Sequence, residues 1–259
     1  MPANAYVQRD QPPGVPPLEL TGERTLPDVP AENYWFARHL AVYEWIGARV
    51  IGRRVIDMAC GEGYGSEVLS RGAASVVGVD ANPEAHEHAR LRYVRQNLRF
   101  ERGMVENHGE RGAYDAIVFL QTIEHVHDPV GVLEHFRSLL APDGVAYVST
   151  PNLLTLAPSG ATKSDNPWHL KEYRAHEFQA LCATTFEHVA LLGLFHARKL
   201  RLHDLALACG WDAVHSRLRI TRPFYYRFTA AIATSDFELR ERAGLDRALD
   251  FLAVCRADS

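Results

Sequence analysis

The sequence has few cysteines and no long apolar run, and each of these absences excludes a class of protein. Its four cysteines lie far apart and form no CxxC pair, so neither a disulfide framework nor a cysteine zinc site is expected. No stretch approaches the ~18 apolar residues of a membrane span. The opening MPANAYVQRDQPPG has neither the basic nor the apolar region of a secretion signal. We therefore expect a cytoplasmic protein.

An excess of positive charge is also missing. Lys and Arg number 28 against 32 Asp and Glu, which gives a formal net charge of −4. A general nucleic-acid-binding protein is usually basic, so we expect no nucleic-acid partner. Hydrophobic residues make up 47% of the 259 residues, which is enough for the core of a globular domain.

Prolines are concentrated at the start of the chain, where half of the 14 fall within the first 30 residues. Such a stretch favours extended structure and breaks helices, and we expect residues 1–20 to form a flexible tail. Residues 21–259 are expected to form a single domain. Within it, the apolar periodicity of residues 31–50 predicts an amphipathic helix, and residues 197–246 are expected to be an insertion near the substrate.

From residue 53 onward, short apolar runs alternate with helical segments. This pattern predicts an α/β fold with a mainly parallel sheet and helices on both faces. Ligands of such sheets bind at the carboxyl ends of the strands. The predicted strands are residues 53–59, 75–80, 98–103, 114–120, 145–151, 186–195 and 249–255.

A glycine loop follows the first predicted strand. The strand ends near Asp57, and glycines follow at 61, 63 and 65. Glycines allow a tight turn and a close approach of a ligand to the backbone. The spacing differs from the GxGxxG of dinucleotide-binding enzymes, and a simple strand-to-helix turn can look similar. Asp80 at the end of the second strand adds a carboxylate that can bind both ribose hydroxyls.

Four motifs resemble those of class I S-adenosylmethionine-dependent methyltransferases: VIDMACGEGYGS, VVGVDANPEA, YDAIVFLQTIEHV and LLAPDGVAYVSTPN. The resemblance covers about residues 22–196, with the motifs in order. It implies a Rossmann-like sheet of seven strands with helices on both faces and an antiparallel last strand. It also implies S-adenosylmethionine as the methyl donor.

The resemblance assigns parts of the cofactor to individual residues. It implies that Asp57, Gly61 and Gly63 surround the methionine part and that Asp80 binds the ribose. It also implies that Met104 and Val105 flank the adenine and that Leu120 and Gln121 lie near the sulfonium.

Further segments, including TGERTLPDVPAENYWFARH, NPWHLKEY and TSDFEL, are similar to actinobacterial methyltransferases of methylmannose and methylglucose polysaccharide synthesis. This resemblance implies an O-methyltransferase whose acceptor is a hydroxyl of a saccharide or glycan precursor. The alternative is a small phenol, quinone or natural product. A homodimer is a further expectation.

Glu124 and His125 follow the fourth predicted strand, and His169 lies in the loop after the fifth, so all three belong to the same rim. Methylating a hydroxyl needs a proton acceptor, which a histidine can supply, or a divalent metal that acidifies the hydroxyl. The pattern is similar to metal-dependent relatives with ExxEH and a distant histidine, which implies Mg²⁺ or Mn²⁺ held by Gln121, Glu124, His125 and His169. Gln121 replaces the first Glu of that motif. A third interpretation is that Glu124 and His125 only cap the next turn.

Residues outside this group have less specific interpretations. His196 ends a predicted strand near the same rim and is interpreted as structural. Tyr34, Trp35, Arg38 and His39 either close over the cofactor or pack the helix on the sheet edge. In the insertion, arginines interleave with aromatic residues, which suits a sugar or a dimer interface: Arg217, Arg219, Arg222, Phe224, Tyr225, Tyr226 and Arg227.

Overall fold

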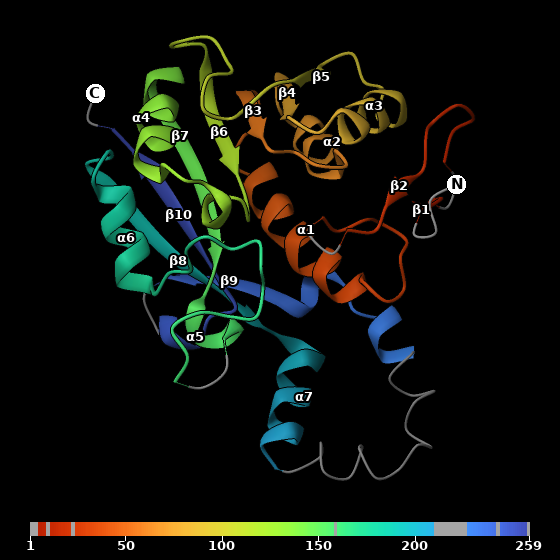
Figure 1. The fold of residues 1–259 in the computed structure, drawn as a ribbon, viewed down its shortest axis with the longest axis vertical. Coiled ribbons are helices and arrows are strands. Elements are labelled where there is room, and N and C mark those ends of the chain that lie inside the picture. The colour runs from red at the N-terminus through yellow and green to blue at the C-terminus, as the bar shows by residue number, and fades with distance from the viewer. Residues whose placement is uncertain are drawn as a thin grey trace.

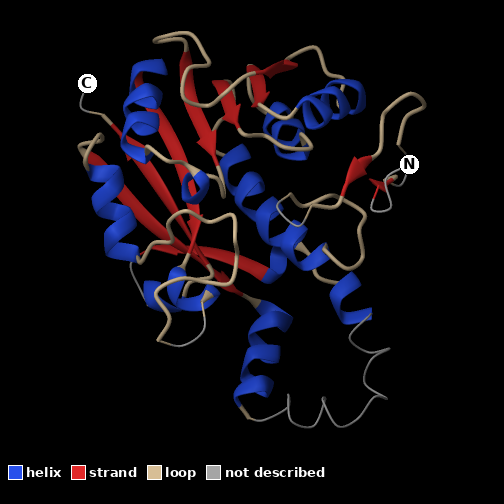
Figure 2. Cartoon of the chain, in the orientation of Figure 1, coloured by secondary structure: helices blue, strands red, loops and turns tan. Residues whose placement is uncertain are grey.

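A computed structural model describes residues 5–8, 11–21, 24–157, 160–209, 227–241 and 244–257. Figure 1 follows the chain from red at the N-terminus to blue at the C-terminus, and Figure 2 colours the same view by secondary structure. The sequence-predicted insertion residues from Arg217 to Tyr226 lie outside the described residues. No helix among the described residues is long and apolar enough to cross a membrane.

The core of the fold is an eight-stranded sheet with the order β5-β4-β3-β6-β7-β10-β8-β9. The five strands from β5 to β7 are parallel, whereas β10 runs antiparallel to both β7 and β8. The Rossmann-like α/β fold with an antiparallel last strand is thereby confirmed (Figure 2). The strands are β3 (Arg54–Met58), β4 (Ser75–Asp80), β5 (Leu98–Arg102), β6 (Tyr114–Phe119), β7 (Leu140–Pro151), β8 (His188–His196), β9 (Phe237–Glu241) and β10 (Asp250–Arg256).

Strand β9 extends the sheet beyond the seven strands expected. It comes from the predicted insertion and pairs antiparallel with β8, with Phe237 opposite His196. Phe237 is buried and Leu239 packs against the core, so this short edge strand presents an apolar face inward. Strand β7 also begins earlier than the expected residue 145. Leu140 already pairs with Tyr114, and the register then shifts, so that Val145 pairs with Ala116 and residues 141–144 form an irregular part of the strand.

Helices cover both faces of the sheet, because neighbouring residues along each strand point to opposite sides. Val55 and Val76 belong to a core cluster with residues of α1, α2 and α3, whereas Ile56 and Val77 belong to a second cluster with α4 and α6. The helices are α1 (Asn33–Gly47), α2 (Tyr64–Ser70), α3 (Pro83–Arg92), α4 (Pro129–Leu139), α5 (Leu153–Leu156), α6 (Ala175–Ala183) and α7 (Arg198–Ala208), with short 3₁₀ turns η1 (Ile123–His125), η3 (Thr234–Asp236) and η4 (Leu245–Arg247).

The described part of the proline-rich segment packs on the domain, which differs from the loose tail expected. Strands β1 (Ala5–Tyr6) and β2 (Leu18–Glu19) form a small antiparallel pair, and Leu18 is fully buried with Leu26 and Val29. Gln8 Nε2 donates to Glu62 Oε1 at 2.7 Å. Prolines exclude helix here, but extended chain can still bury a leucine and reach a distant carboxylate.

Candidate active site

The glycine loop and the residues after β6 and β7 lie at one edge of the sheet. Parallel pairing sets Asp57 beside Val118 of β6, and Val118 beside Tyr147 of β7. The loops that follow these strands therefore leave the sheet on the same side, where open α/β sheets bind ligands.

Only one of the three loop glycines faces open space. A Cβ at Gly61 would have nothing within 4 Å, so the backbone there is accessible to a ligand. A Cβ at Gly63 would lie 2.8 Å from Ala89 Cβ, and one at Gly65 would enter the Tyr43 ring. Gly61 and Gly63 both have positive φ, at 57° and 98°. Gly63 and Gly65 are thus required for packing, and Gly61 for the ligand-facing turn.

Asp80 connects the loop to the end of β4. Its Oδ2 accepts the Gly61 backbone N–H at 2.8 Å, and its Oδ1 accepts that of Asn82 at 2.9 Å. Each carboxylate oxygen can accept more than one hydrogen bond, so Asp80 keeps capacity for two ribose hydroxyls. Met104 is 53% exposed, and Val105 packs against the core beside it. The assignment of these residues to the adenosyl half of the cofactor stays a prediction.

Asp57 lies beneath the loop and is wholly buried. Its Oδ2 accepts from Ser66 Oγ at 2.6 Å, and its Oδ1 accepts from Tyr43 Oη at 3.2 Å. Burial raises the pKa of Asp57 to about 7, despite the two hydrogen bonds, which lower it. A cationic ammonium nearby would favour the ionised form of this carboxyl group.

Gln121 and Leu120 follow β6 directly. Leu120 is buried, and Gln121 has a φ of 51°, which turns the chain out of the strand. The Gln121 side-chain nitrogen donates to Ser149 Oγ of β7 at 3.1 Å. This bond fixes the amide beside β7.

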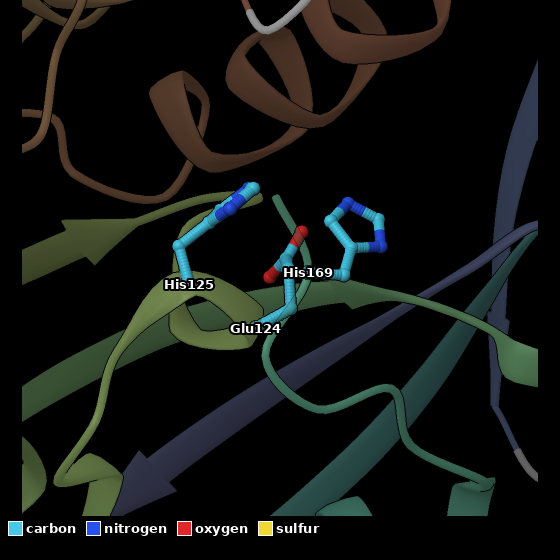
Figure 3. A group of neighbouring side chains, drawn as sticks. All are labelled: Glu124, His125 and His169. Carbon is cyan, nitrogen blue, oxygen red and sulfur yellow. The ribbon is translucent and has the colours of Figure 1, made fainter. Parts of the chain in front are cut away.

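Glu124, His125 and His169 form a compact group on the same rim (Figure 3). One possible metal-ligating atom from each lies within 4.8 Å of the others. Glu124 and His125 belong to η1, and His169 arrives from a loop that the Glu124 carbonyl oxygen holds by accepting the Leu170 N–H at 2.8 Å. The structure thus brings together three of the four residues predicted as metal ligands.

The Glu124 carboxyl group is buried and accepts from Thr150 Oγ1 at 3.2 Å. Burial raises its pKa to about 8, because the charged form is poorly solvated. Thr150 belongs to β7, so its hydroxyl is positioned by the sheet itself.

Hydrogen bonds orient both imidazoles. His169 Nδ1 lies 2.7 Å from Glu172 Oε1, and its Nε2 lies 3.0 Å from Asn166 Nδ2. A carboxylate only accepts, so Nδ1 carries the hydrogen and Nε2 accepts from Asn166. His125 Nδ1 lies 3.0 Å from the Trp168 carbonyl oxygen, which likewise places the hydrogen of the neutral ring on Nδ1. With a hydrogen on Nδ1, the remaining acceptor position of each ring is Nε2, and in His169 this position accepts from Asn166.

A second polar chain continues along the rim. Tyr34 Oη lies 2.7 Å from His196 Nε2, and His196 Nδ1 lies 2.7 Å from Asp204 Oδ2 on α7. These contacts attach α7 to the end of β8 and to the first turn of α1. They agree with the structural interpretation of His196.

Several site residues carry no local sequence signal. Glu172 orients His169 and Thr150 binds Glu124. Both lie inside motifs quoted above, NPWHLKEY and LLAPDGVAYVSTPN, but nothing in those motifs indicated these contacts. His88 of α3 is wholly buried: its Nδ1 lies 2.7 Å from the Pro16 carbonyl oxygen and its Nε2 lies 3.2 Å from Glu62 Oε1. The N-terminal segment thus contacts His88 through Pro16, and no local pattern in the sequence indicates this.

Comparisons with known proteins identify the family and the fold. Residues 31–205 match a methyltransferase domain family. A probable S-adenosylmethionine-dependent methyltransferase of Mycobacterium tuberculosis is 35% identical over 240 residues, covering 90% of this chain and 86% of the relative. A ubiquinone biosynthesis O-methyltransferase of Erwinia tasmaniensis is 34% identical over 116 residues, covering 42% of this chain and 48% of that protein. The fold matches a possible histamine N-methyltransferase of Thermotoga maritima with a TM-score of 0.59 at 15% identity, covering 87% and 94% of the two chains.

Proposed function

The chain belongs to the S-adenosylmethionine-dependent methyltransferases, and from this premise we propose that it methylates a hydroxyl oxygen of a saccharide or glycan precursor. The enzyme class and the methyl donor follow from the family. The acceptor, the catalytic residues and the metal are the proposed parts.

In this proposal the cofactor lies across the carboxyl ends of β3, β4 and β6. Asp80 accepts the ribose hydroxyls, and Met104 and Val105 border the adenine. Asp57, Gly61 and Gly63 form the end that receives methionine, while Leu120 and Gln121 line the region of the sulfonium. The open approach to Gly61 and the remaining acceptor capacity of Asp80 support this placement.

The observation that carries the proposed chemistry is the convergence of Glu124, His125 and His169 within 4.8 Å. A neutral hydroxyl is a weak nucleophile. It must lose its proton as the O–CH₃ bond forms and the S–CH₃ bond of the sulfonium breaks, which releases S-adenosylhomocysteine. The Nδ1 contacts to Trp168 and Glu172 make Nε2 the nitrogen of each imidazole that can accept a proton. His169 Nε2 accepts from Asn166 Nδ2, so His169 can act as the base only when that hydrogen bond breaks.

The same three side chains also fit a divalent cation. They offer one carboxylate and two imidazole nitrogens, and Gln121 is the fourth predicted ligand. This mixed set suits Mn²⁺ better than Mg²⁺, which prefers oxygen ligands. A bound cation would supply acidification and orientation of the acceptor hydroxyl. The Glu172 contact to His169 is the kind of outer hydrogen bond that orients a metal-binding histidine.

Two exposed aromatic side chains support a sugar as the acceptor. Trp35 on α1 is 48% exposed, and Trp168, beside His169, is 58% exposed. A solvent-exposed indole ring can pack against the apolar face of a sugar while the sugar hydroxyls stay solvated. The similarity to ubiquinone O-methyltransferases over 116 residues favours a second candidate, in which the hydroxyl belongs to a phenol or quinol.

A methyl-transfer screen tests the proposal. The protein is incubated with tritiated S-adenosylmethionine and with panels of unmethylated oligosaccharides, phenols and RNA. Label on an oligosaccharide hydroxyl is the expected result. Label on phenols alone would establish the second candidate, and label on RNA alone would overturn both.

The metal is tested in the same assay. EDTA is expected to abolish transfer and added Mn²⁺ or Mg²⁺ to restore it, and Glu124→Gln should mimic EDTA. Glu134→Gln, at an exposed position on α4, is the matched control and should keep full activity. Full transfer in EDTA that is lost on replacing His125 or His169 would instead establish general-base catalysis without metal.

A further inference from the structure

A cavity beside the loop that carries His169 is lined by several basic side chains. It has a volume of about 310 Å³ and lies beyond the carboxyl end of β7, between the starts of α5 and α6. Its lining includes Lys163, Lys171 and Arg174, together with Glu172 and Glu177. This volume is at the lower end of the range for ligand pockets, ~300–1,000 Å³. The cavity can therefore hold a small group that forms one part of a larger ligand.

The wall of the cavity is the His169 loop itself. Glu172 lines the cavity, and its Oε1 lies 2.7 Å from His169 Nδ1. Leu170 and Lys171 also line it, and their backbone N–H groups donate to the Glu124 carbonyl oxygen at 2.8 and 3.2 Å. A ligand group in the cavity would thus be separated from the candidate active site by a single loop.

The three basic side chains of the cavity have no carboxylate partner among the described residues. Lys163, Lys171 and Arg174 are exposed, and none of them belongs to an ion pair in this part of the chain. The Lys171 ammonium lies over the Tyr173 ring, 5.0 Å from its centroid. The positive charges at the cavity are therefore free to meet an anion from outside the protein.

Both carboxylates of the lining, in contrast, already have partners. Glu172 accepts from the Ser164 backbone N–H at 2.7 Å and contacts His169. Glu177 Oε2 accepts the Arg174 backbone N–H at 2.8 Å. Three basic side chains face two carboxylates here, so the lining as a whole is positive.

The presence of lysine at this place is itself unusual. The chain has 28 Lys and Arg residues, of which only three are lysines. Lys199 pairs with Asp236 at 2.9 Å, and the other two, Lys163 and Lys171, line the cavity. Structural ion pairs therefore do not account for the two lysines at the cavity.

A phosphate group suits this lining. An ammonium group supplies a compact positive charge, and a guanidinium can donate two parallel hydrogen bonds to phosphate oxygens. The whole chain has a formal net charge of −4, so the excess of positive charge is local to the cavity. A neutral sugar or a quinol would gain nothing from these charges.

We propose that this cavity binds the phosphate of a phosphorylated saccharide and thereby holds the acceptor hydroxyl at the group formed by Glu124, His125 and His169. The inference rests on the proposed function for the saccharide hydroxyl. It adds the substrate class, which is a sugar phosphate or a nucleoside diphosphate sugar.

Calorimetry on the full chain with S-adenosylhomocysteine present tests the proposal. The probes are the 1-phosphates and the nucleoside diphosphate derivatives of glucose and mannose, and the neutral methyl glycosides of the same sugars. The double variant Lys163→Gln and Lys171→Gln removes two charges and keeps the Lys171 backbone N–H. Its matched control, Arg53→Gln and Arg111→Gln, removes two charges at exposed positions elsewhere. Thermal unfolding checks that each variant is folded.

The wild type is expected to bind at least one phosphorylated sugar more tightly than its neutral glycoside. The lysine double variant should lose about tenfold in that affinity, the scale of a charge-assisted contact that stays partly exposed, whereas the control should not. Added NaCl should weaken the same binding. The tighter of the 1-phosphate and diphosphate probes identifies the source of the phosphate.

Two results would overturn the proposal: no phosphorylated sugar binds more tightly than its neutral glycoside, or the two double variants lose affinity equally. Lysine-dependent binding of a phosphorylated sugar that is never methylated would contradict the proposed acceptor and leave the cavity's role intact. Methylation of neutral oligosaccharides without any binding of phosphorylated sugars would contradict this inference alone.

Discussion

Arg38 of α1 and Asp250, the first residue of β10, form a buried bidentate ion pair that fastens the helix to the sheet. Arg38 Nε donates to Asp250 Oδ2 at 2.6 Å, and its Nη2 donates to Oδ1 and to the Leu249 carbonyl oxygen. The Arg38 side chain is 10% exposed and that of Asp250 5%. This pair holds the helix that carries His39 over the rim.

Breaking this pair should destabilise the fold strongly. Arg38→Met leaves the Asp250 carboxylate buried without its cation, which typically costs ~3–5 kcal/mol. The double variant Arg38→Met and Asp250→Leu should recover much of that loss, since it buries no charge. Urea unfolding measures both. A single variant as stable as the wild type would show that the pair contributes little.

Asp80→Ala should weaken binding of S-adenosylhomocysteine. The variant removes the ribose acceptor, and hydrogen bonds to a charged group contribute roughly 1.5–3 kcal/mol each. Asp128→Ala is a suitable control, because Asp128 also accepts a backbone N–H, from Gly131, but at the start of α4. Calorimetry should show weaker binding for Asp80→Ala alone. Equal affinities would place the ribose elsewhere.

Asp57 should make stability depend on pH near neutrality. Its pKa is raised from an ordinary 3.8 to about 7. The folded state therefore binds the Asp57 proton more tightly than the unfolded state does. The resulting stabilisation is fully present below pH ~4 and is lost as pH rises through ~7. Between pH 5 and pH 8 the wild type should lose about 2–3 kcal/mol more stability than Asp57→Asn.

Urea unfolding at the two pH values measures this difference. Glu124, whose pKa burial also raises, is present in both proteins, so its effect cancels in the comparison. Parallel pH profiles for the two proteins would contradict a raised pKa at Asp57.

The N-terminal segment should contribute to stability through Leu18. Leu18→Ala removes a fully buried side chain, and such truncations cost about 2–5 kcal/mol in well-packed cores. Val7→Ala is the control, because Val7 is 57% exposed. Thermal unfolding should show a lower melting temperature for Leu18→Ala and little change for Val7→Ala. If neither variant changed the melting temperature, the result would support the flexible tail that the sequence predicted.

The fold could be predicted well from the sequence because its signals are local. Buried strands such as 75–80 are short apolar runs, and the loops after them carry glycines and carboxylates at fixed offsets from the strand ends. Parallel pairing then places those strand ends on one edge of the sheet, so Asp80, Glu124 and His125 could be assigned to a common rim. Strand β9 was missed although its five residues, FELRE, alternate between apolar and polar, because so short a segment offers only two apolar residues and lies inside the predicted insertion.

Local sequence patterns were therefore enough to assign the order of most strands and helices, the glycine loop and the rim on which the candidate site lies. The contacts of His39 with Tyr64, of Glu172 with His169 and of Gln8 with Glu62 became visible only in the folded chain. The Gln8 and His39 contacts join residues 54 and 25 positions apart along the chain, and even the short Glu172 contact depends on how a loop is held against Glu124. Periodicity reports only which face of a segment is buried, whereas the partner that a buried polar group finds is set by how separate segments pack together.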